Sequence, residues 1–482
     1  MNEDFVLSVL AETKSLIEYG GVSRRYENNL SLLGMLLKET NCNDAKRDAF
    51  ASEFLQPSTD ILAGAFSFDT VSDTEIELYL RNVRGLVLFV RNLTVSTSAH
   101  LDLVSLLSSM RKLISNVERG QNYFTACLQA FLQVLANYCL NQRPDSISFS
   151  GDLVGTLDEP IVAFIQGEKK LDLRSPFNIF LSKYLLSRDN GAVVFMHGEH
   201  AHFMKYIFEE AFHQAHTDCF QSGLLPFFEK LVTEREFGYW LKKQDLSQFV
   251  TRVLTVCQLV VTNKQDWDSP KCVVMITWVF EVCKDLMETS VHLLQSKTSD
   301  DAALDQIHTQ LVRALDILSD LCKFSIVPQY LRDLHAIDIL IRLLRAAHEN
   351  TEVKTPKLRK QAEDVYGNSS VRTMKSFPLV KSLVIEILAY LCHESFPTQE
   401  AMRELHGLEL ILSNCVIDED NPYIKEHSVL CLRFVLQENQ RNQEFVALLE
   451  AKQVVNADAL SEAGYEVSIK DGKVKVRNSD SP

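Results

Sequence analysis

The sequence predicts an all-α protein whose short helices stack into a solenoid, and three observations support this prediction. Apolar residues make up 46% of the 482 residues and recur mostly at helical spacing, with only 17 Gly and 12 Pro. Short motifs recur at intervals near 45 residues. The apolar faces near the C-terminus cannot be buried by single helices, whereas stacked pairs of helices bury one another.

The N-terminal part predicts several amphipathic helices separated by polar turns. Residues 1–56 contain two or three of them, and loops are expected around Gln56–Asp60 and Ser67–Asp73. The run Asp73-Thr-Glu-Ile76 then has the composition of a helix start and predicts a long helix over Glu75–Leu93.

The middle of the chain contains two long irregular stretches. Asn141–Pro176 holds three prolines, and its one expected helix is short, at Glu159–Gln166. An apolar helix is predicted over Cys272–Leu286. The second stretch, Glu349–Ser376, is polar and basic, and we interpret it as a flexible insertion within one repeat.

The C-terminal part predicts three helical segments between Phe377 and Glu444. Their apolar faces are Leu379, Leu383, Ile387 and Leu391; Leu405, Leu408, Ile411 and Leu412; and Val429, Leu432, Val435 and Leu436. Beyond them, Tyr465–Val476 alternates between apolar and polar residues around Asp471-Gly472. This pattern predicts a small β-hairpin with a type I′ turn, packed on the last helices.

A recurring helix ending sets the length of the repeat. It begins at Val90, Leu135, Leu318, Leu388 and Leu432, at steps of 45, 183, 70 and 44 residues. Armadillo and HEAT repeats occupy roughly 40–47 residues. The steps therefore correspond to one repeat, about four repeats, one repeat with an insertion, and one repeat. The predicted fold is an armadillo/HEAT-like α-solenoid, a right-handed superhelix.

The last hundred residues also carry a family resemblance. The matching residues are Leu391-Cys392, Gly407-Leu408, Leu410-Ile411-Leu412, Asn414-Cys415, Asp418, Asp420-Asn421-Pro422, Asn442-Gln443 and Gly464-Tyr465-Glu466-Val467, with weaker matches at Arg91-Asn92 and Leu135-Ala136-Asn137. This segment resembles the C-terminal signature domain of the ataxin-10 family, whose members are armadillo-like. Between about 145 and 375 only compatible helix patterns are seen.

The resemblance implies a non-enzymatic protein–protein interaction scaffold or adaptor that acts in cytokinesis or growth signalling and needs no cofactor. Some fungal members of that family carry a copper-transport label. The predicted organisation has five parts: repeats over 1–140, an irregular linker over 141–176, central repeats over 177–348, the basic insertion over 349–376 and the signature domain over 377–482.

Composition limits the partners and the compartment. The formal net charge is −15, which disfavours nucleic acid and anionic membranes as main partners. Eleven cysteines without a CxxC pair indicate a reducing compartment. The acidic N-terminus predicts no leader, and the longest apolar run, Cys272–Phe280, is too short for a membrane span. We therefore expect a cytoplasmic protein with protein partners, and self-association stays open.

Two asparagines are candidate partner-binding residues. Armadillo proteins that bind extended peptides use a ladder of asparagines, and Asn92 and Asn137 match it. The equivalent positions Asp320, Tyr390 and Phe434 break the ladder. An importin-like binding mode is therefore disfavoured, and recognition of a folded partner or a helix is expected. Structural bonds from Asn92 and Asn137 to neighbouring carbonyls are the favoured interpretation.

The turn at Asp418, Asp420 and Asn421 is a second candidate binding site. It resembles part of a calcium loop but lacks the following glycine and the distal glutamate. We interpret it as an Asx turn between two helices, with an exposed role open to its acidic side chains.

The cluster from His197 to Cys219 is the alternative functional site. On a helix, Glu209, His213 and His216 share one face, and Cys219 offers a fourth ligand for zinc or copper. No HExxH motif accompanies them, so an exposed polar helix is the favoured interpretation. The sequence also lacks phosphate-binding loops and nucleophile motifs, which predicts that the protein is not an enzyme.

Overall fold

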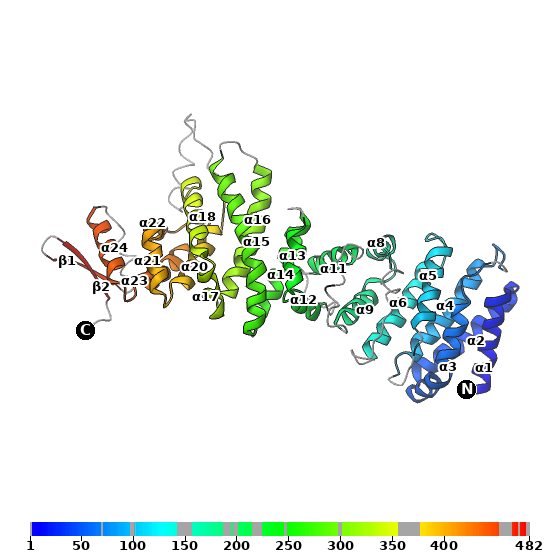
Figure 1. Cartoon of the computed structure of the whole chain (residues 1–482). Helices are drawn as coiled ribbons and strands as arrows, with labels where there is room; N and C mark the ends of the chain where they lie inside the picture. The colour runs from blue at the N-terminus through cyan, green and yellow to red at the C-terminus, as the bar shows by residue number, and fades with distance from the viewer. Residues whose placement is uncertain are drawn as a thin grey trace. The chain divides into compact units, whose positions relative to one another are not determined.

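The computed structural model describes residues 2–68, 71–96, 101, 103–141, 157–186, 193, 196, 201–214, 224–244, 248–296, 301–354, 376–452, 465–470 and 473–478. Within these residues the chain forms helices and two strands (Figure 1). The contacts divide it into two units, Met1–Lys230 and Leu231–Pro482. The finer five-part division stays a prediction.

The first unit stacks helices in two rows. Its helices are α1 (Glu3–Tyr19), α2 (Ser23–Cys42), α3 (Asp44–Ala63), α4 (Ile76–Leu93), α5 (Leu103–Asn116), α6 (Phe124–Asn141), α8 (Glu159–Gly167), α9 (Arg174–Leu186) and α11 (Ala201–Gln214), with α12 (Leu225–Leu231) at the boundary. Helices α2, α4, α6 and α9 pack in succession, and α3 and α5 pack beside them. Equivalent helices of successive repeats therefore contact each other, as in a solenoid.

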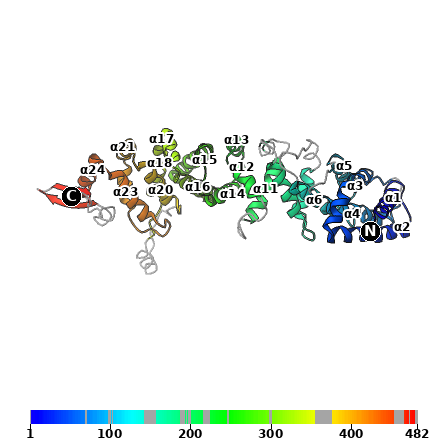
Figure 2. The same cartoon turned by 90° about the horizontal axis from the view of Figure 1, so that it is seen from below.

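The second unit repeats this arrangement. Its helices are α13 (Arg235–Lys242), α14 (Gln248–Asn263), α15 (Ser269–Gln295), α16 (Asp301–Leu321), α17 (Ile326–Asp333), α18 (Ala336–Asn350), α20 (Val380–Cys392), α21 (Phe396–Glu404), α22 (Gly407–Ser413), α23 (Ile424–Leu436) and α24 (Gln440–Lys452). Helices α14, α16, α20 and α23 pack in succession (Figure 2).

The predicted repeat motif lies on these stacked helices. Val90 and Leu135 are in α4 and α6 of the first unit, and Leu318, Leu388 and Leu432 are in α16, α20 and α23 of the second. All five side chains are fully buried. The helical repeat is therefore confirmed within each unit, while the repeat count between Leu135 and Leu318 and the handedness of the superhelix stay predictions.

Left-handed backbone conformations mark the same period. Leu379 and Tyr423, with φ of 66° and 62°, precede α20 and α23 and are 44 residues apart. Glu394 and Glu438, with φ of 51° and 53°, follow these helices and are also 44 residues apart. Helices α20 and α23 therefore begin and end with the same left-handed backbone conformation, at positions that correspond between the two repeats.

Several sequence expectations need correction. The predicted loop at Gln56–Asp60 is wrong, because α3 continues through it with Pro57 inside the helix. Its neighbours Leu55 and Ile61 are buried, so packing maintains the helix. Leu379 was expected on a buried face but is exposed, because it caps α20 instead of lying within it. The short helix in the 141–176 linker is confirmed as α8.

Two strands lie near the C-terminus. β1 (Tyr465–Lys470) and β2 (Lys473–Asn478) pair antiparallel, with Tyr465 opposite Asn478, and β2 lies beside α24. The predicted type I′ turn at Asp471-Gly472 lies outside the described residues, as does Gly464. Among the helices of the described ranges, none combines the length and apolar character needed to cross a membrane.

Candidate functional site: the signature segment

A buried ion pair organises the loop between α22 and α23. Lys381, in the first turn of α20, places its Nζ 3.0 Å from Oδ2 of Asp418, and the two side chains are 1% and 0% exposed. The same carboxylate oxygen accepts a hydrogen bond of 2.8 Å from Asn421 Nδ2. Asp418 Oδ1 accepts from the backbone N–H of Asp420 at 3.1 Å. This last bond confirms the predicted Asx turn.

The pKa of Asp418 reflects this environment. Burial alone raises the pKa of its carboxyl group, because a charge is costly away from water. The hydrogen bond and positive charge of Lys381, with the bonds from Asn421 and Lys354, outweigh that effect and hold the pKa below its ordinary value. Asp418 is therefore ionised, and its charge is used inside the fold.

Backbone bonds attach the loop to two other segments. The Lys354 N–H donates to Asp418 Oδ1 at 3.2 Å, and the Lys354 carbonyl accepts from the Glu419 N–H at 2.8 Å. The Leu379 N–H donates to the Asp420 carbonyl at 2.8 Å. Lys354 also pairs with the Asp420 side chain, Nζ to Oδ2 2.8 Å. The loop is therefore attached at Lys354 and at Leu379.

Large apolar side chains emerge around this fixed loop. Ile417 and Tyr423, on either side of the buried turn, are 64% and 71% exposed. Leu379, whose backbone is bonded to the same loop, is also exposed. We call these three exposed apolar side chains, Leu379, Ile417 and Tyr423, the signature patch. Exposed apolar side chains on an ordered backbone lose little conformational entropy when another protein contacts them.

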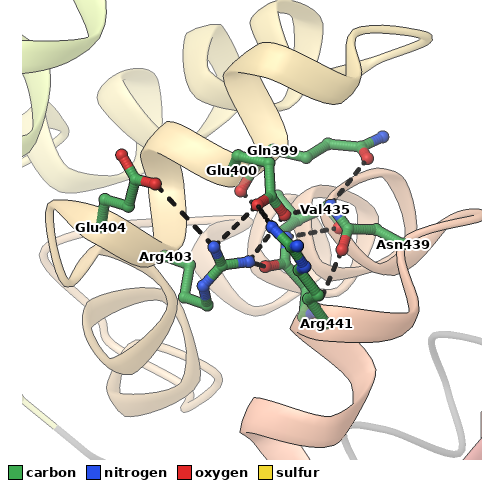
Figure 3. Close-up of polar contacts among 8 residues, drawn as sticks. Gln399, Glu400, Arg403, Glu404, Val435, Asn439 and Arg441 are labelled. Carbon is green, nitrogen blue, oxygen red and sulfur yellow. Dashed lines mark hydrogen bonds and ion pairs between the residues drawn. The ribbon is translucent and has the colours of Figure 1, made fainter.

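A second polar network joins α21 to the start of α24 (Figure 3). Arg403 contacts both carboxylate oxygens of Glu400, at 2.6 and 2.7 Å, and Asn439 and Arg441 add contacts of 3.1 and 3.3 Å. These hydrogen bonds, led by that of Arg403, lower the pKa of Glu400 to about 2. The buried Asn442 bonds both Gln399 O and Val435 O. This network fixes the last two helical layers.

The two asparagines of the predicted ladder bond within the fold. Asn137 Nδ2 donates to the Arg91 carbonyl at 3.1 Å, in the preceding stacked helix. Asn92 Nδ2 donates to Leu37 O at 3.4 Å and to Thr40 Oγ1 at 3.0 Å. The favoured interpretation, a structural bond to a neighbouring carbonyl, is therefore confirmed. Contact of these side chains with a partner stays a prediction.

The structure describes only part of the predicted metal site between His197 and Cys219. His213 lies in α11, with Nε2 4.0 Å from Glu209 Oε2, and is exposed. His197, His216 and Cys219 lie outside the described residues. Among the residues that the structure describes, no group of three metal-binding side chains is found.

Sequence reasoning missed Lys381 and the signature patch. A lysine within the apolar run Val380–Cys392 was the available signal for a buried charge, since such a residue requires an opposite charge. Its partner Asp418 is distant in sequence and becomes its neighbour only when α20 and α23 stack. The exposure of Leu379 and Tyr423 depends on their left-handed backbone, which the sequence did not indicate.

Comparison with known proteins agrees with these features. Residues 380–477 match the family model described as spinocerebellar ataxia type 10 protein domain. This range includes Lys381, Asp418 and the Glu400 network, but not Lys354 or Leu379. The chain is 35% identical to the ataxin-10 homolog of Debaryomyces hansenii, over 100% of this chain and 98% of that relative. It is 28% identical to the homologs of Candida glabrata and Saccharomyces cerevisiae, each over 94% of this chain and over 95% and 91% of those relatives. With this similarity along its whole length, the chain belongs to the ataxin-10 family.

Proposed function

We propose that this protein is a non-enzymatic scaffold or adaptor that binds a partner protein through the signature patch. The observation that carries the proposal is the fixed α22–α23 loop with Ile417 and Tyr423 exposed on either side of a buried ion pair. The acidic residues of the turn have positioning roles. Asp418 holds the loop, and the apolar side chains beside it make the contact.

Rigidity favours such a contact. A loop that is already ordered loses little conformational entropy when a partner binds, so more of the contact energy appears as affinity. Tyrosine is also enriched among the residues that dominate binding energies, because it offers a large contact area and a hydroxyl group. In cells we place this scaffold in cytokinesis or growth signalling, the setting that the family resemblance implies.

The test compares partner recovery with matched variants. Full-length protein is purified by affinity from native lysate, alongside the double variant Ile417→Ser/Tyr423→Ser and the control Val22→Ser/Tyr19→Ser. The control changes side chains that are 63% and 74% exposed on the first unit. We expect near-stoichiometric partners with the unaltered and control proteins, and their loss with the patch variant.

Circular dichroism and a denaturation midpoint show whether each variant is folded. An identical set of recovered proteins with all three forms would contradict docking at the patch. Recovery of chaperones alone, by all three forms, would contradict the scaffold role itself.

A further inference from the structure

A groove of about 450 Å³ lies between α13 and α15 in the second unit, outside the segment that matches the family model. Helix α13 lines it with one face, through Arg235, Gly238, Tyr239 and Lys242. These are positions i, i+3, i+4 and i+7, which lie on one helical face. The apolar wall on α15 includes Val274, Trp278 and Val282.

The floor of the groove is rigid. A Cβ atom added at Gly238 would lie 2.4 Å from the Cβ of Trp278, so the two helices touch here and only glycine fits. The Trp278 indole donates from Nε1 to the Val232 carbonyl at 2.9 Å and meets Phe237 edge to face, with ring centroids 5.1 Å apart. The shape of the groove is therefore set before any ligand arrives.

The two helices run in the same direction. Gly238 lies against Trp278, and one turn later on both helices Lys242 pairs with Glu281, Nζ to Oε2 3.0 Å. Parallel neighbours of this kind are equivalent helices of successive repeats. A third helix can pack along the crease between two parallel helices.

Charge differs between the two ends of the groove. Arg235 supplies a cation at one end. At the other end Lys242 lies between two carboxylates, Glu281 at 3.0 Å and Asp285 at 3.8 Å, which leaves an excess of negative charge. The ends are seven residues apart along α13, which is about 10 Å at the helical rise.

We infer that this groove binds an amphipathic helix of a partner protein. Its apolar face contacts Tyr239 and Trp278, an acidic side chain faces Arg235, and a basic side chain two turns away faces Glu281 and Asp285. Because each charge meets its opposite, the order of the two charges along the helix sets its direction, and a helix with the acidic side chain first lies parallel to α13. The inference rests on the proposed scaffold role and gives it a second surface with a partner of defined chemistry.

The experiment selects helices against the full-length protein. The probe is a displayed library of helices about 14 residues long, or four turns. Its leucine stripe is fixed, and the flanking positions are randomised among Glu, Lys and Ala. We expect enrichment of helices with one Glu and one Lys two turns apart, in either order, over helices with like charges at these positions. Selection against Arg235→Glu is expected to favour Lys at both positions.

Binding of the best selected helix is then measured by fluorescence anisotropy. Tyr239→Ser is expected to weaken it about 10-fold or more, as loss of an aromatic anchor does. Tyr19→Ser is the matched control, since both tyrosines are 74% exposed, and it is expected to leave the affinity unchanged. Enrichment that does not depend on the charges at the two positions, no enrichment, or equal binding to Tyr239→Ser would each overturn the inference.

Two further arms separate the possible failures. The patch variant Ile417→Ser/Tyr423→Ser is expected to bind the selected helix normally, so a failed selection with intact patch-dependent partners would refute the groove alone. An apolar fluorescent dye is the second probe. If it binds and is lost with Tyr239→Ser while no helix is selected, the groove takes a small apolar ligand and the inference is wrong.

Discussion

Lys381 and Asp418 show how a single pair of residues can determine the shape of a loop. A charge buried alone costs several kcal/mol, so each residue is tolerated because the other faces it. Asn421 and the backbone N–H of Lys354 donate further hydrogen bonds to the Asp418 carboxylate. The pair therefore specifies where the loop lies more than it adds to overall stability.

Removing one member of the pair is expected to be costly. Asp418→Ala leaves the Lys381 ammonium buried without a counter-charge, and we expect the free energy of unfolding to fall by about 3–5 kcal/mol. Lys354 and Asp420 form the control pair. Lys354 is half exposed, so Asp420→Ala is expected to cost less than about 1 kcal/mol. Urea denaturation of the three proteins measures the difference, and equal losses would show that Lys381 finds water or another partner.

The low pKa of Glu400 predicts that the folded protein loses stability as the pH falls. Its pKa falls from the ordinary 4.5 to about 2 in the folded chain, so the folded state binds the proton less readily than the unfolded state. Its stabilising contribution is complete above about pH 4.5 and is lost as the pH falls towards 2. Urea midpoints measured across this range are expected to fall less steeply for Glu400→Gln than for the unaltered protein.

Glu404→Gln is the control for that measurement. Oε1 of Glu404 lies 3.9 Å from Nη2 of the same arginine, Arg403, but the Glu404 side chain is largely exposed. Its substitution is expected to leave the acid profile unchanged. A profile that Glu400→Gln does not alter would mean that the network of Figure 3 opens in solution.

At the scale of the element, the turns of the last repeats are held in an unfavourable backbone conformation. Leu379, Glu394, Tyr423 and Glu438 all have positive φ, although none is glycine. Such a residue pays about 1–2 kcal/mol relative to a right-handed conformation. The packing of α20 on α23 must supply that energy, since it fixes where each helix begins and ends.

Glycine at such a turn is expected to stabilise the protein. For Glu438→Gly, relief of about 1–2 kcal/mol of strain exceeds the entropy that glycine adds to the unfolded chain, about 0.5–1 kcal/mol. We expect an increase of up to about 1 kcal/mol in the free energy of unfolding. Glu438→Ala retains the Cβ atom and is expected to give no increase. A gain with alanine equal to that with glycine would assign the effect to the lost charge.

The helices could be predicted because their faces and their period are local properties of the sequence. The start signal before Glu75 was sufficient to predict α4, and the repeat spacing placed Val90 and Leu135 at corresponding positions of two helices, α4 and α6. Pro57 misled the prediction. Pro57 removes the N–H that the Glu53 carbonyl would accept, and Glu53 lies on the exposed side of α3, so this position tolerates the loss. The candidate site was less predictable, since Lys381 meets Asp418 only through stacking.

At the scale of the whole molecule, the interior excludes solvent from nearly all thiols. Nine of the ten cysteines in the described ranges are buried, and Cys42 is exposed. Burial raises the pKa of the Cys127 and Cys139 thiols to about 12, so neither forms a reactive thiolate at neutral pH. These cysteines act as small apolar side chains of the core.

Thiol labelling therefore reports on the integrity of the whole structure. In a Cys219→Ser background, which removes the cysteine outside the described residues, we expect iodoacetamide to modify Cys42 rapidly. The buried cysteines are expected to react only as the chain unfolds, because reagent and thiolate must meet. Peptide mapping by mass spectrometry identifies the sites. Early labelling of Cys127 or Cys139 would indicate that the first unit opens without global unfolding.

The attachment of Lys354 and Leu379 to one loop has a consequence for how the gene can change. Both residues bond the segment from Asp418 to Asp420, so the two ends of the intervening stretch are anchored at the same place. Because the ends of this stretch are held together, each added residue raises the entropic cost of closing the loop only slightly. Insertions and deletions between 355 and 375 are therefore expected to cost little stability and to leave the register of the helical stack unchanged.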